Sequence, residues 1–358
     1  MGTVYSDMVD WSLARQLARF AAKAGSTPPP LPDTDFATLV ADSERHLRDY
    51  TRLEPVGGIP APEVVDREEW AEVNVDSLGS LLGPVTDRLG SRFDGAGPFA
   101  GPLRTAAGAT VAAECGLVLG YMSQRVLGQY ELSLLEPERP PRLLFVGPNL
   151  ARAIRDLDID ADSFLRWIVL HEVTHVLQFS GVPWLREHMG ALMREYLGTV
   201  EVRIERGAAG GLPSMPNMND LVERFREGGL VALVQTHEQR RIFDRIQAVM
   251  SVIEGYSEHV MDVVGEQVLP AYEGLRDAME RRRHNRSAPE RVLQRMLGLD
   301  LKMRQYELGK RFCDAVAEKH GIETLNRVWN SPESIPTLAE IEDPEAWVAR
   351  VRGELAAA

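Results

Sequence analysis

Apolar side chains recur every three or four residues along most of the 358-residue chain, which is the spacing of amphipathic helices. In residues 9–23, for example, Trp11, Leu13, Leu17 and Phe20 alternate with arginine and lysine. The same pattern predicts further helices over residues 34–53, 105–126, 164–179, 185–197, 237–265, 289–297 and 301–319. Segments rich in proline and glycine separate several of them. The predicted fold class is therefore mainly α with a small β element.

The clearest strand is predicted at residues 141–149, where a continuous apolar run lies between prolines. A short strand or turn at residues 64–70 is predicted to run into another helix. Because the 141–149 strand comes shortly before the helix at 164–179, it could be an edge strand that pairs with an extended substrate. The alternative is a plain core or edge strand.

Small residues dominate the helix predicted over 105–126. Gly116 and Gly120 within it, and Gly128 after it, would let neighbouring backbones approach closely. The apolar stretch 106–122 is interrupted by Glu114 and is short for a membrane span of about 20 residues. We therefore predict a tightly packed core helix and no membrane partner.

The chain is acidic, with a formal net charge of −13. Nucleic-acid binding depends on clustered lysine and arginine, so we expect no nucleic-acid partner. The one dense basic run, residues 281–286, is predicted to be a solvated loop. Cys115 and Cys313 cannot form a disulfide framework, and an acidic N-terminus does not resemble a secretory signal. These features predict a cytoplasmic location; they do not predict an oligomeric state.

One short motif carries a specific chemistry. His171, Glu172 and His175 form an H-E-x-x-H pattern inside the helix predicted over 164–179. Residues four apart lie on one face of a helix, so two imidazoles at this spacing can bind one metal ion, for which zinc is the expected metal. A catalytic zinc keeps three protein ligands and one water, and Glu172 is the predicted base that accepts the proton of that water. The alternative is a pair of hydrogen-bonded core histidines.

The third metal ligand must come from elsewhere in the chain. A longer motif would need glycine at 178 and histidine at 181, but the chain has Gln178 and Gly181. Glu254 is the first candidate, because the residues on its helix face are apolar or small and its carboxylate would need a cation. Other candidates are His259, Glu187, His188, Glu195 and His237.

For two residues that follow Glu254 in the same helix, the sequence predicts different roles. His259 follows by five residues, about 140° around a regular helix, so both residues cannot reach one metal. Glu258 follows by one turn and could orient a ligand histidine, or could be an ordinary solvated glutamate. The transition state also needs a donor to the oxyanion, and Tyr306 and His259 are the candidates, although for Tyr306 the sequence favours a core tyrosine.

Several blocks of sequence together resemble one actinobacterial family, the zincin-like metallopeptidases, and most of all its branch associated with deazaflavin coenzyme biosynthesis. The resemblance covers nearly the whole chain. It rests on Val126-Leu127-Gly128-Gln129-Tyr130, Pro148-Asn149, the motif from His171 to Phe179, Pro183-Trp184-Leu185-Arg186, and Glu254-Gly255. It implies a mostly helical zincin-like fold with a gluzincin-type site, but no particular substrate.

We expect a helical N-terminal region over residues 1–100 and a catalytic region over 101–358, joined in one globular unit. The first functional hypothesis is a zinc hydrolase, most of all a peptidase, in which His171, His175 and Glu254 bind zinc and Glu172 activates water. The substrate would be a peptide or a small-molecule amide, with a non-peptide amide or ester as a variant. The rival hypothesis is a zinc-containing scaffold in a coenzyme pathway, in which a fourth protein ligand would close the site.

Overall fold

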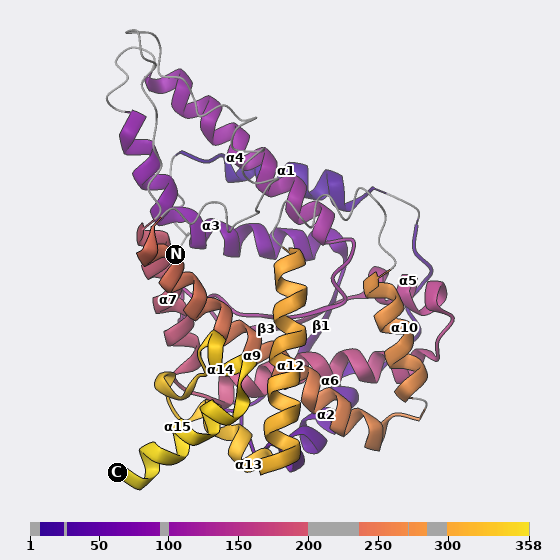
Figure 1. Cartoon of the computed structure of the whole chain (residues 1–358). Coiled ribbons are helices and arrows are strands. Elements are labelled where there is room, and N and C mark those ends of the chain that lie inside the picture. Colours follow the sequence, from indigo (N-terminus) through magenta and orange to yellow (C-terminus); the bar gives the residue numbers. More distant parts are fainter. Residues whose placement is uncertain are drawn as a thin grey trace. The chain divides into compact units, whose positions relative to one another are not determined.

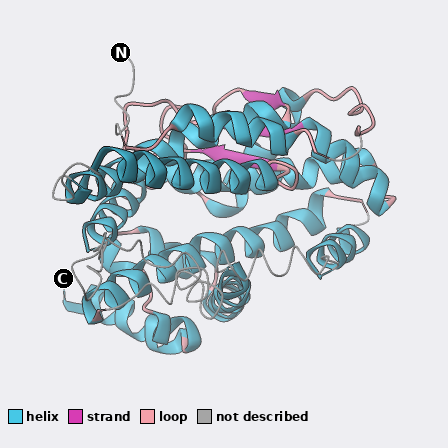
Figure 2. Ribbon diagram, turned by 90° about the horizontal axis from the view of Figure 1, so that it is seen from above, coloured by secondary structure: helices cyan, strands magenta, loops and turns pink. Residues whose placement is uncertain are grey.

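The computed structural model describes residues 8–24, 27–93, 100–199, 236–270, 272–284 and 299–357. Helices make up about three quarters of this part of the chain, and the strands form one small sheet (Figure 2). The predicted fold class, mainly α with a small β element, is confirmed.

The helices and strands, most of which are labelled in Figure 1, fall into two compact units. The first unit holds α1 (Trp11–Ala22), β1 (Pro62–Val65), α3 (Arg67–Phe93), α4 (Ala100–Met122), β2 (Gly128–Glu131), β3 (Arg142–Val146) and α5 (Gly147–Leu157). The second unit holds α2 (Phe36–Thr51), α6 (Ala161–Gly181), α7 (Leu185–Thr199), α9 (His237–Val268), α10 (Tyr272–His284), α12 (Leu299–His320), α13 (Ile322–Leu325), the 3₁₀ turns η3 (Asn326–Trp329) and η4 (Pro332–Ser334), α14 (Leu338–Glu342) and α15 (Pro344–Ala357). The boundary that we predict between residues 100 and 101 falls at the start of α4; that division of the chain stays a prediction.

The sheet of the first unit has the strand order β1-β3-β2. Strand β3 pairs in parallel with β1 and antiparallel with β2, so both of its edges are occupied. Leu143, Leu144, Phe145 and Val146 of β3 are all fully buried. The prediction of a strand here is confirmed, but the suggestion that it pairs with substrate as an edge strand is wrong, because it is the central strand.

Helix α4 packs against α1 through its glycines. A side chain at Gly116 would overlap the carbonyl of Ala14, and one at Gly120 would overlap Ala18 and Ala21. The predicted close approach of backbones is confirmed at these two positions. By length and composition alone α4 could cross a membrane, yet it shares a buried core with α1, α3 and the sheet, which is the packing expected of a core helix.

The second unit is built around the contact between α9 and α12, two long helices that lie against each other (Figure 1). Gly255 of α9 faces Gly309 of α12 so closely that a Cβ on Gly255 would overlap the Gly309 backbone. A Cβ on Gly309 would in turn overlap the backbone of Ser251. The two glycines therefore set the distance between the helices, and with it the position of Glu254, the neighbour of Gly255.

We expect Gly255→Ala to destabilise the protein. The added methyl group meets backbone atoms that cannot rotate away, so the loss should lie at or above the upper end of the roughly 1–3 kcal/mol typical of overpacked cores. Gly274→Ala in α10 is the matched control, because a Cβ there has no neighbour within 4 Å. It should be neutral or stabilise by up to about 1 kcal/mol. Urea unfolding of both variants measures the difference, and equal stabilities would show that this helix contact is not tight.

The structure differs from the sequence prediction at several connections. Helix α5 starts directly after β3, with Pro148 in its first turn and Asn149 buried, where we predict the end of a strand. Helix α10 includes residues 281–284 of the basic run that we predict to be a loop. For the tail at 329–351 the sequence predicts one short helix, but the structure has two helices there, α14 and α15, and the 3₁₀ turn η4. The helix predicted at 289–297 lies outside the described residues, and so does the stretch 207–219, whose glycine and proline residues predict a surface loop.

Candidate metal centre

Helix α6 carries the H-E-x-x-H motif through the interior of the second unit. Phe164, Leu165, Val169, Val173, Val176 and Leu177 are buried and cover a broad apolar side of the helix. A helix with so wide an apolar side must pack that side against other elements, which fixes its rotation. His171 and His175 are only partly covered, so the one polar stripe of this helix remains accessible.

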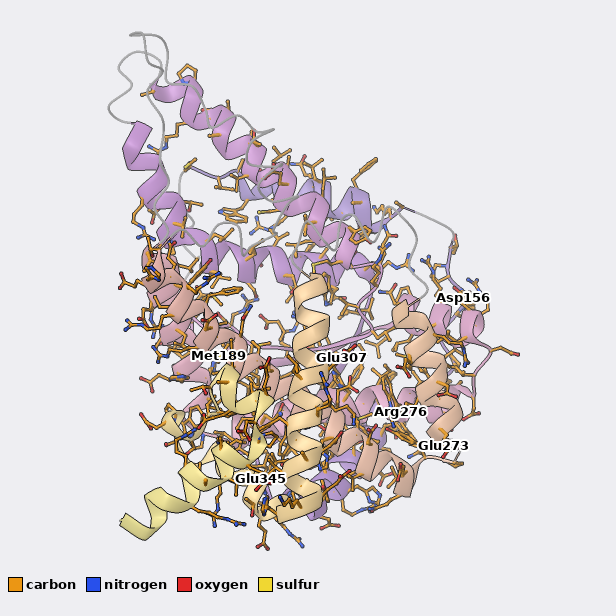
Figure 3. All side chains as sticks on the ribbon, in the orientation of Figure 1. Asp156, Met189, Glu273, Arg276, Glu307 and Glu345 are labelled. Carbon is orange, nitrogen blue, oxygen red and sulfur yellow. The ribbon has the colours of Figure 1, made fainter. Side chains whose placement is uncertain are left out.

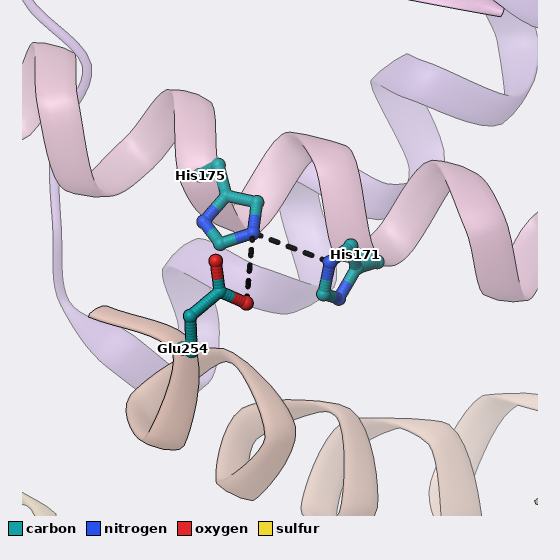
Figure 4. Close-up of side chains that lie close together, drawn as sticks. All are labelled: His171, His175 and Glu254. Carbon is teal, nitrogen blue, oxygen red and sulfur yellow. Dashed lines mark hydrogen bonds and ion pairs between the residues drawn. The ribbon is translucent and has the colours of Figure 1, made fainter. Parts of the chain in front are cut away.

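The two histidines and Glu254 converge on one point (Figure 4). His171 Nε2 and His175 Nε2 lie 3.2 Å apart, and His175 Nε2 lies 4.0 Å from a carboxylate oxygen of Glu254. Ligand atoms about 2.1 Å from a tetrahedral zinc are about 3.4 Å apart, so the histidine pair already has the separation that zinc requires. The carboxylate would move inward by a few tenths of an ångström. The structure thus brings together the three residues that we predict as ligands.

Gln178 fixes the orientation of His175. The buried Gln178 amide donates from Nε2 to the carbonyl of Ile253 in α9, at 2.9 Å. Its oxygen therefore faces His175 Nδ1, also at 2.9 Å, and accepts the Nδ1–H. The neutral ring then carries its lone pair on Nε2, the atom that points towards His171 and Glu254. Sequence reasoning used Gln178 only to exclude the longer motif, which needs glycine there, and assigned it no role in the site.

His171 is held in a similar way from α9. The hydroxyl of the fully buried Ser257 lies 3.2 Å from His171 Nδ1, and the Trp167 ring stacks on the imidazole with an interplanar angle of 14°. Ser257 lies three residues after Glu254, on the same helix face. The contacts from Ser257 and Gln178 are therefore the ones that orient the ligand histidines; a similar role for Glu258 stays a prediction.

Glu172, the predicted base, follows His171 directly and is only 7% exposed. It makes at least one polar interaction within the protein. Its place in the motif and its burial suit the role of a base, which stays a prediction.

His259 lies away from the ligand group, as the helix-phase argument predicts. Its Nδ1 is 2.8 Å from Asp314 and its Nε2 is 2.7 Å from the hydroxyl of Tyr50. Burial alone would raise the pKa of Asp314, but hydrogen bonds from His259 and Lys310 hold it below its usual value. Asp314 is thus ionised and accepts the Nδ1–H of His259, and the Tyr50 hydroxyl is the hydrogen-bond partner of Nε2. Both ring nitrogens are engaged, and donation to an oxyanion, still a prediction, would require His259 to leave one partner.

Tyr306, the other predicted oxyanion donor, falls in the first turns of α12. Its side chain lies outside the described residues. Its role therefore stays a prediction.

Two histidines of an H-E-x-x-H helix and a glutamate from a second helix form the donor set of a zincin-type metal site. The model of the zincin-like metallopeptidase family matches residues 9–348, and the chain belongs to this family. It is also similar to a solved structure from Chloroflexus aurantiacus described as a "putative hydrolase with a novel fold". The two chains share 32% identity with a TM-score of 0.70, over 96% of this chain and 99% of the other. No curated protein matches the sequence.

We expect Gln178→Leu to weaken zinc binding by about 10–100-fold, the usual effect of removing a partner that orients a metal-binding histidine. The variant loses both the acceptor for His175 and the link to Ile253. Ser180→Ala is the matched control, because the Ser180 hydroxyl bonds only the Val176 carbonyl of its own helix. Competition with a zinc-binding dye measures the affinities. Equal affinity in the wild type and Gln178→Leu would show that this hydrogen bond does not tune the site.

Proposed function

We propose that this protein is a zinc-dependent hydrolase that cleaves amide bonds, in peptides first of all. The observation that carries the proposal is the convergence of His171, His175 and Glu254, with both imidazoles oriented by polar partners. The family supports a hydrolase of the zincin type. The choice of a peptide bond over another amide or an ester is part of the proposal.

The donor set suits zinc. Two imidazole nitrogens and a carboxylate are borderline ligands that zinc accepts, and among the described residues the group contains three of them. Catalytic zinc sites have three protein ligands, whereas structural sites usually have four. This count favours an enzyme over a zinc-containing scaffold. Zinc held there would lower the pKa of a coordinated water to about 7 and polarise a substrate carbonyl.

The protein's own residues would supply the remaining chemistry. His175 would keep its Nε2 lone pair towards the shared point because the Gln178 oxygen faces its Nδ1, and the Ser257 hydroxyl would hold the His171 ring in place through Nδ1. Glu172 would accept the proton of the attacking water and deliver it to the leaving amine. We further propose that this reaction takes place in the cytoplasm.

The test is substrate profiling of the full-length protein with a peptide library and a panel of small-molecule amides. We expect cleavage that stops on treatment with 1,10-phenanthroline and returns when zinc is restored. If the protein cleaved only non-peptide amides, the proposal of a hydrolase would stand and the proposal of a peptidase would be wrong. Cleavage that persists after complete removal of metal would contradict a zinc-dependent mechanism.

A further inference from the structure

A cavity of about 840 Å³ opens beside the first half of α9, within the second unit. It lies between α9, the α7 residue His188, which is next to Met189 labelled in Figure 3, and the segment from Pro332 to Ala339. Cavities that bind small molecules have volumes of about 300–1,000 Å³. The size of this one therefore suits an organic ligand.

The cavity is separate from the metal centre. Arg245, which lines it, precedes Glu254 by nine residues, about two and a half helical turns. The two side chains therefore leave opposite sides of α9, roughly 13 Å apart along its axis. A ligand in the cavity would contact the helix that carries Glu254 without reaching the metal ligands.

Cations dominate one wall. Arg240, Arg241 and Arg245 line the cavity from α9, against the carboxylates of Asp244 and Glu333. Arg245 lies 3.4 Å from Glu195, a residue outside the lining. Arg240 and Arg241 form no ion pair with any residue in the described part of the chain. The wall thus holds more guanidinium charge than its own carboxylates neutralise.

The arrangement on the helix brings two exposed guanidinium groups close together. Arg241 and Arg245 are four residues apart and share one helix face, where like charges repel. The positive charge of Arg245, after the larger effect of burial, lowers the pKa of His188. His188 is thus kept neutral beside the arginines, and an anion placed among these groups would relieve the repulsion.

Most of the remaining lining is apolar. Val249 of α9 and Ile335 and Leu338 of the facing segment contribute aliphatic side chains. A cavity with apolar walls and a few convergent charged groups is typical of sites that bind an organic ion by its charge and its hydrocarbon body together. A fully hydrated inorganic ion would leave most of this volume unused.

We propose that this cavity is a second ligand site, which binds a small organic anion with a carboxylate or phosphate group and an apolar body. The guanidinium groups of Arg241 and Arg245 bind the anionic group, since arginine forms paired hydrogen bonds with both kinds of oxygen anion. The hydrocarbon part contacts Val249, Ile335 and Leu338. The site does not depend on the proposed hydrolase activity.

Calorimetric titration of the full-length protein tests the proposal with three probes: phenylacetate, phenyl phosphate and neutral 2-phenylethanol. We expect at least one of the two anions to bind more tightly than the alcohol, and the tighter anion identifies the natural group. The double variant Arg241→Ala/Arg245→Ala should lose about tenfold or more in affinity. Arg311→Ala, an exposed arginine of α12 outside the cavity, is the matched control and should bind as the wild type does.

Two further variants keep the test decisive. Ala339→Trp adds a bulky side chain to the lining of the cavity without removing charge and should block binding even if the arginine variant is unstable. Glu254→Ala should leave the binding of the anion unchanged, because that residue lies on the other side of α9. Equal binding of the alcohol and both anions, full binding by the arginine variant or by Ala339→Trp, or loss of binding in Glu254→Ala would each overturn the proposal.

Discussion

Replacing Glu172 by glutamine should leave zinc in place and reduce hydrolysis by about 10²–10⁴-fold, the usual contribution of general acid–base catalysis. Glutamine has nearly the same shape as glutamate but cannot accept a proton at neutral pH. Glu172 is buried and adjacent to His171, so the isosteric change should preserve the packing of α6. The measurement is kcat on a substrate found by profiling, together with zinc content of the same preparation.

The matched control is Glu318→Gln, which makes the same chemical change at an exposed position of α12. It should retain full activity. If Glu172→Gln also retained full activity with normal zinc, Glu172 would not be the base. If Glu172→Gln lost zinc, the loss of hydrolysis would come from a damaged metal site and not from a missing proton transfer.

Glu254→Ala should lose most of its bound zinc. The substitution removes one of three direct bonds to the metal, and two histidines alone cannot complete a tetrahedral site. We expect the zinc affinity to fall by clearly more than the 10–100-fold that follows loss of an orienting partner. Elemental analysis after dialysis against a weak chelator measures the retained metal.

Two variants on the same helix serve as controls. Glu258→Ala should cost at most about 10–100-fold in zinc affinity, the effect of losing a partner that orients a ligand histidine. His259→Ala should retain zinc while lowering the free energy of unfolding by about 1–3 kcal/mol, because it leaves Tyr50 and Asp314 without their shared partner. Normal zinc in Glu254→Ala combined with zinc loss in His259→Ala would contradict the assignment of the third ligand.

The sequence was informative about the site wherever the helical repeat shows which polar side chains lie on the same face of a helix. The four-residue spacing of His171 and His175 predicts a shared face, and Figure 4 shows the two rings meeting there. Glu254 could be chosen because a carboxylate with small and apolar neighbours on its face needs a cation. The same periodicity separates His259 from the ligands, and the structure places it between Tyr50 and Asp314.

The residues that orient the histidines were not predictable in the same way. Gln178 acts because its amide joins His175 to the Ile253 carbonyl, and Ser257 acts because α9 packs on α6. Both depend on contacts between helices about eighty residues apart in sequence. In the sequence, Gln178 can be recognised as a polar residue one turn after His175 on the same helix face. This position indicates an orienting role only when a hydrogen-bond partner is sought for Nδ1 of His175.

Strand β3 and helix α5 show the same limit at the level of the fold. The apolar run at 142–146 predicts a buried strand, but no local pattern shows that two neighbours cover its edges. Proline in the first turn of a helix is favourable, so Pro148 starts α5 instead of only ending β3. Asn149 is buried there because its amide bonds Arg67 and the carbonyls of Ser123 and Val126.

The measurement that tests the central claim most directly is anomalous diffraction at the zinc absorption edge from crystals of the protein purified without added metal. We predict one strong peak within about 2.0–2.2 Å of His171 Nε2, His175 Nε2 and a Glu254 oxygen, with the fourth position open to water. A peak bound by a different set of side chains, or a fourth protein ligand that closes the site, would contradict the proposal of a catalytic zinc centre.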